Sequence, residues 1–123
     1  MKRWLFTLIS ALSFSLAAAD LKSISSDELL SADTSEWLIL DVRSDEEFAQ
    51  GHVPNALNIA HKDVAEQLSR IAEFKDKPVV VYCRSGRRAG MAAEILTEAG
   101  FSDVRHLEGD IMGWKEAGHR LAQ

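Results

Sequence analysis

The 123-residue chain has little of several features that define other protein classes. Its single cysteine, Cys83, rules out an intramolecular disulfide and a zinc site made of four cysteines. Only 7 glycines and 2 prolines argue against a disordered or fibrous chain. The 14 Lys and Arg are outnumbered by 19 Asp and Glu, so the net charge of −5 provides no basic field for nucleic acid. With 46% hydrophobic residues, these figures favour one compact acidic domain.

The first residues have the order of features found in a secretory signal peptide. Two basic residues lead into an uncharged, mostly apolar run over residues 4–16, and three alanines at 17–19 supply a small-residue cleavage site. The run is shorter than the about 20 residues that span a bilayer. We therefore predict a signal peptide over residues 1–19 and a mature domain over residues 20–123, with an uncleaved anchor or a buried helix as the alternative. The mature protein, with a net charge of about −7, is expected to be exported to a bacterial periplasm and soluble, without stable membrane association.

Strand and helix signals alternate through residues 20–123, without repeats or low-complexity segments. Strands separated by helices need parallel crossover connections, which place helices on both faces of a sheet. We therefore predict an α/β fold, a three-layer α/β/α sandwich around a mainly parallel sheet of about five strands. The expected strands are 21–24, 37–42, 56–60, 79–82 and 104–107. Two helices are expected to begin at the capping boxes at 25–28 and 44–47. Two more are indicated by apolar stripes at helical spacing, one at Val64, Leu68, Ile71 and Ala72 and one at Ala92, Ile95, Leu96 and Ala99. A last short helix is expected at 110–117.

The residues that carry chemistry follow the most apolar of these strands. Residues 79–82 are apolar without alternation, which is typical of a central strand covered on both faces. Cys83 comes next, at the carboxyl end where parallel sheets bind ligands, and a helix begins a few residues later. A lone cysteine in such a place is often a small core residue. Here Gly86 lets backbone N–H groups converge and three nearby arginines add positive charge, so the context favours a reactive thiolate and an anionic substrate.

Several motifs occur in order along residues 20–123. They are Asp41-Val42-Arg43, Glu47-Phe48, Gly51-His52-Val53-Pro54-Asn55-Ala56, Tyr82-Cys83-Arg84-Ser85-Gly86-Arg87-Arg88-Ala89, Leu107-Glu108-Gly109 and Trp114. Together they resemble the rhodanese-like sulfurtransferases over nearly the whole mature chain. The resemblance implies that Cys83 accepts a sulfane sulfur as a persulfide and passes it to a nucleophile. It implies a small anionic sulfur donor such as thiosulfate, cyanide or a thiol as the acceptor, and no cofactor. The resemblance does not identify a protein that would accept the sulfur.

The same resemblance gives the loop after the strand its roles. Cys83 is the expected catalytic nucleophile, with the backbone amides of the loop and Arg88 around the transferred sulfur. Arg84 and Arg87 are expected to face the sulfonate group of the donor. The expected substrate-binding residues are thus Arg84, Ser85, Gly86, Arg87 and Arg88.

Two other functions stay open at this stage. Related phosphatases and arsenate reductases separate the cysteine and the arginine by five residues, which would need an arginine where this chain has Ala89. Four residues separate Cys83 from Arg88, and the shorter loop suits a sulfur atom better than a tetrahedral phosphoryl group. The second alternative is a non-catalytic sulfur carrier or binding module. Some rhodanese-like modules of that kind have lost the cysteine, which this chain keeps.

Three further residues are expected to support the site. Asp41, at a strand end beside Arg43, is interpreted as a hydrogen-bonding or ion-pairing residue of the structure rather than a general base. His52 lies in a turn and is expected to hold loops together. The other histidines lie far apart without ligand spacing, so no metal is predicted.

Two positions depart from the pattern of many rhodanese-like proteins. Asn55 stands where many members have glycine after the proline of the His-Val-Pro turn. Asp110 stands where many have a second glycine after Gly109. Because Asn and Asp tolerate left-handed backbone better than other non-glycine residues, we expect both turns to survive.

Overall fold

The structure, a computed structural model, describes residues 21–123. The signal peptide predicted over residues 1–19 lies outside the described residues. Among the helices of residues 21–123, none combines the length and the apolar composition that crossing a bilayer requires.

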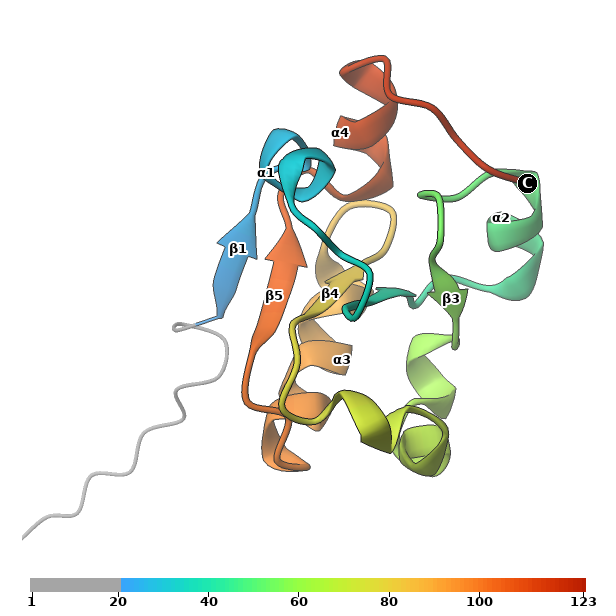
Figure 1. Cartoon of the computed structure of the whole chain (residues 1–123). Helices are drawn as coiled ribbons and strands as arrows, with labels where there is room; N and C mark the ends of the chain where they lie inside the picture. The colour runs from blue at the N-terminus through green and yellow to red at the C-terminus, as the bar shows by residue number, and fades with distance from the viewer. Residues whose placement is uncertain (1–20) are drawn as a thin grey trace, which may run out of the picture.

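The described residues form one five-stranded sheet in which every pairing is parallel (Figure 1). The spatial order is β1-β5-β4-β2-β3, so the apolar strand before Cys83 is central, and all four of its residues are buried. Each strand falls within the range expected from the sequence, and the expected sheet is confirmed. The strands are β1 (Lys22–Ile24), β2 (Leu38–Asp41), β3 (Leu57–Asn58), β4 (Val79–Tyr82) and β5 (Val104–Leu107).

Helical segments alternate with these strands along the chain. The α-helices are α1 (Ser26–Ser31), α2 (Asp45–Gln50), α3 (Arg87–Glu98) and α4 (Asp110–Glu116). Two 3₁₀ segments, η1 (His61–Asp63) and η2 (Ala65–Phe74), lie between β3 and β4.

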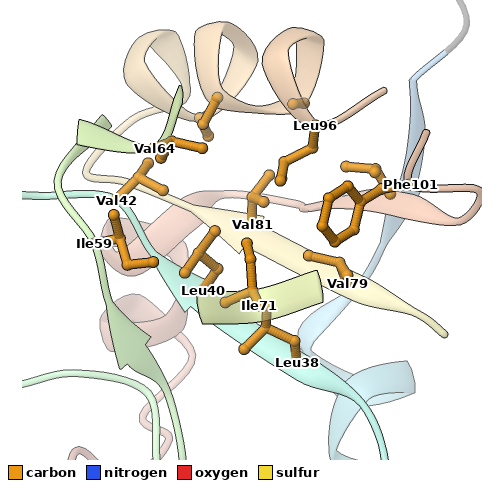
Figure 2. Packing of buried hydrophobic residues seen from close by; sticks show 14 of the residues in the cluster. Leu38, Leu40, Val42, Ile59, Val64, Ile71, Val79, Val81, Leu96 and Phe101 are labelled. Atoms are coloured by element: carbon orange, nitrogen blue, oxygen red, sulfur yellow. The ribbon is translucent and has the colours of Figure 1, made fainter. Parts of the chain in front are cut away.

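Apolar side chains on the two faces of the sheet form two separate cores. In one core, Leu40 of β2 and Val81 of β4 point into the same space as Ile71 of η2 and Leu96 of α3, as Figure 2 shows. The other core packs the opposite face against α1 and α4, around the buried Trp114. Helical segments therefore cover both faces, and the three-layer α/β/α arrangement is confirmed.

The segment between β3 and β4 differs from its prediction. The stripe at Val64, Leu68, Ile71 and Ala72 predicted a regular helix, but the chain forms 3₁₀ turns with non-helical backbone at Gln67 and Ile71. Val64 and Ile71 are fully buried, Leu68 is half-buried and Ala72 is exposed. A 3₁₀ turn also returns to the same side after about three residues, so the apolar spacing located the buried positions without specifying the kind of helix.

Both predicted capping boxes are present. In each, a serine hydroxyl accepts the backbone N–H of a glutamate three positions later, and that glutamate accepts the backbone N–H of the serine. The pairs are Ser25–Glu28 before α1 and Ser44–Glu47 before α2. Gly51 ends α2, as its position in the sequence predicted.

The two turns that depart from the family pattern keep a left-handed backbone. Asn55 has φ 71° and Asp110 has φ 55°, so the tolerance expected of these two residue types is confirmed. Asp110 is also the first residue of α4, directly after Gly109 with φ 81°.

Candidate active site

The residues selected from the sequence gather at the carboxyl edge of the sheet. β2 ends at Asp41, β4 ends just before Cys83 and β5 ends at Leu107. These strands are parallel neighbours, so their ends share one edge. Figure 1 shows the loop between β4 and α3 at this edge, beneath α4. Ligands bind at this position in open α/β sheets.

The sulfur of Cys83 is held by backbone amides. Sγ accepts the N–H of Gly86 at 3.0 Å and the N–H of Ala89 at 3.4 Å, and the residue is 1% exposed. Gly86 precedes α3 with φ 120°, a conformation that L side chains rarely adopt, and this turn aims its own N–H and that of Ala89, in the first turn of α3, at the sulfur. Donors arranged in this way stabilise negative charge on the sulfur, as a thiolate or as a persulfide.

The guanidinium of Arg88 is bound by Glu47 of α2. Nη1 and Nη2 donate to the two carboxylate oxygens at 2.8 and 3.2 Å. The hydrogen bond from Arg88 is the largest cause that lowers the pKa of Glu47 to about 2. Within residues 21–123 the contacts on the Cys83 sulfur come from amides, whereas Arg88, expected around the sulfur, is directed to Glu47. Arg88 therefore ties the start of α3 to α2.

The other polar residues of the loop are open to solvent. Arg84, Ser85 and Arg87 all have exposed side chains. Arg84 lines a cleft of about 360 Å³ between α2 and α4, to which Arg43 and Lys115 also contribute. The loop therefore presents two exposed cations, one of them in a cleft large enough for a small anion.

Asp41 is part of a buried network. Arg43 donates through Nε and Nη2 to both oxygens of Asp41 at 2.7 to 3.1 Å, and through Nη2 to the carbonyl of Gly51 at 2.8 Å. The Tyr82 hydroxyl donates to Asp41 at 2.6 Å and accepts the N–H of Val53 at 3.0 Å. Burial and the charge of Asp41 raise the pKa of Tyr82. The geometry places Asp41 and Arg43 in a structural support that joins β2, β4 and the chain after α2.

His52 connects segments at the same edge. Its Nδ1 lies 2.9 Å from the carbonyl oxygen of Phe48, and its ring stacks on the Phe48 ring with centroids 3.6 Å apart. Its backbone pairs with Ala122, which brings the C-terminus beside α2 (Figure 1). These contacts place His52 in loop packing.

Three residues in contact with or beside the loop, Glu47, Ala89 and Asp110, were not selected as site residues from the sequence. Glu47 binds the arginine and Ala89 donates to the sulfur. Asp110 accepts the backbone N–H of Cys83 at 2.9 Å and lies 3.0 Å from Nε2 of His106. In the sequence, Glu47 belonged to a capping box and to the Glu47-Phe48 motif, and Asp110 began the last expected helix and departed from the family pattern, but neither was given a role at the site.

Within the rest of residues 21–123, the other candidates for a functional site are a metal site and a second cleft. In residues 21–123, no three His, Cys, Asp or Glu side chains form a group that could hold a metal ion. A second cleft of about 290 Å³, between α1 and the chain that follows α4, is lined by none of the site residues expected from the sequence. The loop after β4 is therefore the candidate active site.

Comparison with known proteins shows to which family the chain belongs. The sequence profile of one protein family, described as the rhodanese-like domain, matches residues 25–117. The chain belongs to the rhodanese family. It is 39% identical over 87 residues to a sulfurtransferase of Allochromatium vinosum, covering 71% of this chain and 79% of the relative. It is 41% identical over 70 residues to the thiosulfate sulfurtransferase PspE of Escherichia coli, covering 57% and 67%.

A solved rhodanese-related protein shares the fold. A rhodanese-related protein from Thermoplasma volcanium superposes with a TM-score of 0.73 at 29% identity, over 82% of this chain and 97% of that one. The domain also occurs within larger enzymes: the chain is 36% identical over 84 residues to the tRNA uridine(34) hydroxylase of Photorhabdus laumondii, of which it covers 24%. With these relatives, the chain belongs to the rhodanese-like sulfurtransferase family.

Proposed function

We propose that this protein is a thiosulfate sulfurtransferase that carries sulfur on Cys83 and delivers it to cyanide or a thiol. The observation that carries the proposal is the amide cradle, in which the N–H groups of Gly86 and Ala89 face a cysteine sulfur after the central strand. The similarity to a relative named as a thiosulfate sulfurtransferase supports thiosulfate as the donor. A small dianion also fits a loop that exposes Arg84 and Arg87.

The first step is attack of the Cys83 thiolate on the outer sulfur of thiosulfate. A bond forms between the two sulfur atoms while the bond from the outer sulfur to the sulfonate sulfur breaks, and its electron pair leaves with sulfite. A thiolate and a dianion become a persulfide anion and a sulfite dianion, so charge and electrons balance without a redox partner. The two amide donors stabilise the anionic sulfur on both sides of the step.

The second step returns the thiolate. Cyanide or a thiolate acceptor attacks the outer sulfur of the persulfide, the bond to Sγ of Cys83 breaks, and its electron pair stays on Sγ. The products are thiocyanate or an acceptor persulfide. Because a covalent intermediate separates the two substrates, the kinetics are expected to be ping-pong.

Intact-protein mass spectrometry tests this cycle directly. Reduced protein lacking residues 1–19 is measured alone, after thiosulfate, and after thiosulfate followed by cyanide. We expect the gain of one sulfur atom with thiosulfate, its loss with cyanide, and neither change in Cys83→Ser. The absence of the gain in the wild-type protein, or its presence in the Cys83→Ser variant, would overturn the mechanism.

The two alternatives predict different outcomes of the same experiment and one companion assay. A sulfur carrier without catalytic turnover would take up the sulfur but release thiocyanate no faster than a free thiol persulfide. A phosphatase would leave the mass unchanged and hydrolyse an aryl phosphate in a Cys83-dependent way. Multiple-turnover release of thiocyanate without aryl phosphate hydrolysis is the result that we expect.

We further propose that the protein works in the periplasm after removal of residues 1–19. The apolar run 4–16 and the alanines before Asp20 support this location. The test is expression of the full chain in a Gram-negative host, osmotic-shock fractionation, and N-terminal sequencing. Mature protein that begins at Asp20 in the shock fluid is expected, and a full-length chain retained with the cytoplasm or the membrane would contradict the proposal.

A further inference from the structure

A buried carboxylate lies directly behind the nucleophile. Asp110 is 2% exposed, and its Oδ1 accepts the backbone N–H of Cys83 at 2.9 Å. The two residues are 27 positions apart and belong to different elements, so α4 supplies this contact to the loop after β4. A buried charge is costly unless it is paired and hydrogen-bonded, which makes this carboxylate a specific feature of the site rather than a solvated surface group.

The start of α4 binds the loop through its backbone as well. The N–H of Ile111 donates to the carbonyl of Cys83 at 3.0 Å, and the N–H of Met112 donates to the carbonyl of Arg84 at 3.4 Å. Together with the Asp110 contact, α4 thus holds the N–H and the C=O of the nucleophile and the C=O of the following residue. The left-handed backbone of Asp110, at φ 55°, starts the helix at the point that allows these three contacts.

The carboxylate is paired with a histidine. Nε2 of His106 lies 3.0 Å from both oxygens of Asp110, and the hydrogen bond to Asp110 raises the pKa of His106 above its usual value. The other charged group that faces the imidazole is Glu108, which also raises that pKa and accepts a hydrogen bond from Ser23 of β1. From the active loop, a Cβ at Gly86 would lie 3.4 Å from Oδ2 of Asp110 and 3.8 Å from Nε2 of His106, so the pair packs directly against the sulfur cradle.

We propose that Asp110 is a positioning residue for sulfur transfer, which fixes the backbone of Cys83, and that protonated His106 cancels the carboxylate charge beside the reacting sulfur. The inference rests on the function proposed above. A thiolate, its persulfide and thiosulfate are all anions, so an uncompensated carboxylate next to them would oppose each step. When His106 loses its proton, the pair changes from neutral to a net charge of −1, and transfer from an anionic donor slows.

Three variants separate the backbone contact from the charge. Asp110→Asn keeps an oxygen for the N–H of Cys83 but removes the charge, whereas Asp110→Ala removes both. His106→Gln keeps a hydrogen-bond donor without a positive charge. His119→Gln is the matched control, because His119 contacts Ser26 and Trp114 rather than the active loop.

The measurement is single-turnover release of sulfite from thiosulfate between pH 5.5 and 9.5, which avoids the titration of cyanide. We expect the wild-type and His119→Gln proteins to lose rate on the alkaline side, and Asp110→Asn to lack that loss. At pH 7, His106→Gln is expected to be about threefold to tenfold slower, because an unpaired negative charge remains beside the sulfur. At pH 7, Asp110→Ala is expected to be about tenfold slower, because the N–H of Cys83 is left buried without an acceptor, and without the carboxylate it is expected to show no alkaline loss.

The double variant His106→Gln/Asp110→Asn gives the decisive comparison. If His106 acts through the carboxylate, its substitution changes nothing once Asp110 is Asn. The same loss in both backgrounds, an unchanged alkaline limb in Asp110→Asn, or an unchanged rate in Asp110→Ala would each overturn the proposal.

A second readout does not depend on thiosulfate. Alkylation of Cys83 by iodoacetamide at pH 7 is expected to be slower in His106→Gln than in the wild-type protein and to recover in the double variant. If the wild-type protein forms no persulfide, the proposed function fails while these alkylation rates still test the Asp110–His106 pair. Equal alkylation rates in all variants would overturn the inference even where sulfur transfer is observed.

Discussion

Replacing Glu47 by Gln is expected to destabilise the protein through the contact between α2 and α3. Glu47 receives two hydrogen bonds from Arg88, at 2.8 and 3.2 Å, and both side chains are about a third exposed or less, at 31% and 28%. Lowering the pKa of Glu47 from 4.5 to about 2 corresponds to about 3 kcal/mol at roughly 1.4 kcal/mol per pH unit. Solvent screens a pair with this exposure, so we expect a loss of about 1 to 2 kcal/mol.

The sign of the pH dependence gives the sharper test. The pKa of Glu47 is lower in the folded than in the unfolded protein, so its contribution is complete above about pH 4.5 and is lost as the pH falls towards about 2. Urea denaturation at pH 7, 4 and 3 measures the contribution of Glu47 to the unfolding free energy. The difference in unfolding free energy between the wild-type and Glu47→Gln proteins is expected to shrink across this series. Glu46→Gln, at the exposed neighbouring position, is the control. A difference that stays constant down to pH 3, or an equal loss in Glu46→Gln, would refute the assigned ion pair.

The remaining predictions concern the backbone and the buried network. Tyr82→Phe removes a hydroxyl bound to the buried Asp41 and is expected to lower the unfolding free energy by about 1 to 3 kcal/mol in urea denaturation; an unchanged value would contradict the network. Gly86→Ala places a side chain at φ 120° and is expected to slow persulfide formation in a folded protein. Its control, Gly90→Ala, lies within α3 with open space around it and is expected to raise the unfolding free energy by about 0.5 to 1 kcal/mol without changing the rate; equal rates in the two variants would refute the argument. Arg87→Ala is expected to weaken thiosulfate binding, and an unchanged apparent affinity would count against that role.

Local patterns in the sequence were enough to predict the sheet. The unbroken apolar residues 79–82 identified the central strand, because only a strand covered on both faces tolerates such a run. Capping boxes located the starts of α1 and α2, since a serine and a glutamate three residues apart satisfy each other's backbone. The 3₁₀ turns between β3 and β4 could not be predicted in this way. Burial of Val64 and Ile71 is compatible with either kind of helix, and the choice depends on how the turns pack against α3.

The sequence predicted the part of the site that is local to Cys83, but not the contacts that come from residues distant in sequence. Cys83 and Gly86 lie in the loop after β4 and Ala89 lies in the first turn of α3, so the strand-to-helix transition determines which amides contact the sulfur. Glu47 reaches this loop from 41 residues away and Asp110 from 27, and neither spacing leaves a periodic signal. Contacts of this kind depend on which helices the parallel sheet places side by side at its carboxyl edge.

The carboxylates of Glu47 and Asp110 also determine which positive groups remain free to attract the proposed anionic donor. Glu47 neutralises Arg88, so this arginine contributes little net charge despite its place at the start of α3. Asp110 would add a negative charge beside the sulfur, but its pairing with His106 offsets that charge while the imidazole is protonated. The attraction that remains comes from the backbone N–H groups around Sγ and from the exposed Arg84 and Arg87. In the proposed mechanism the roles are therefore divided: the paired groups set the shape of the loop, and the exposed arginines attract the anionic donor.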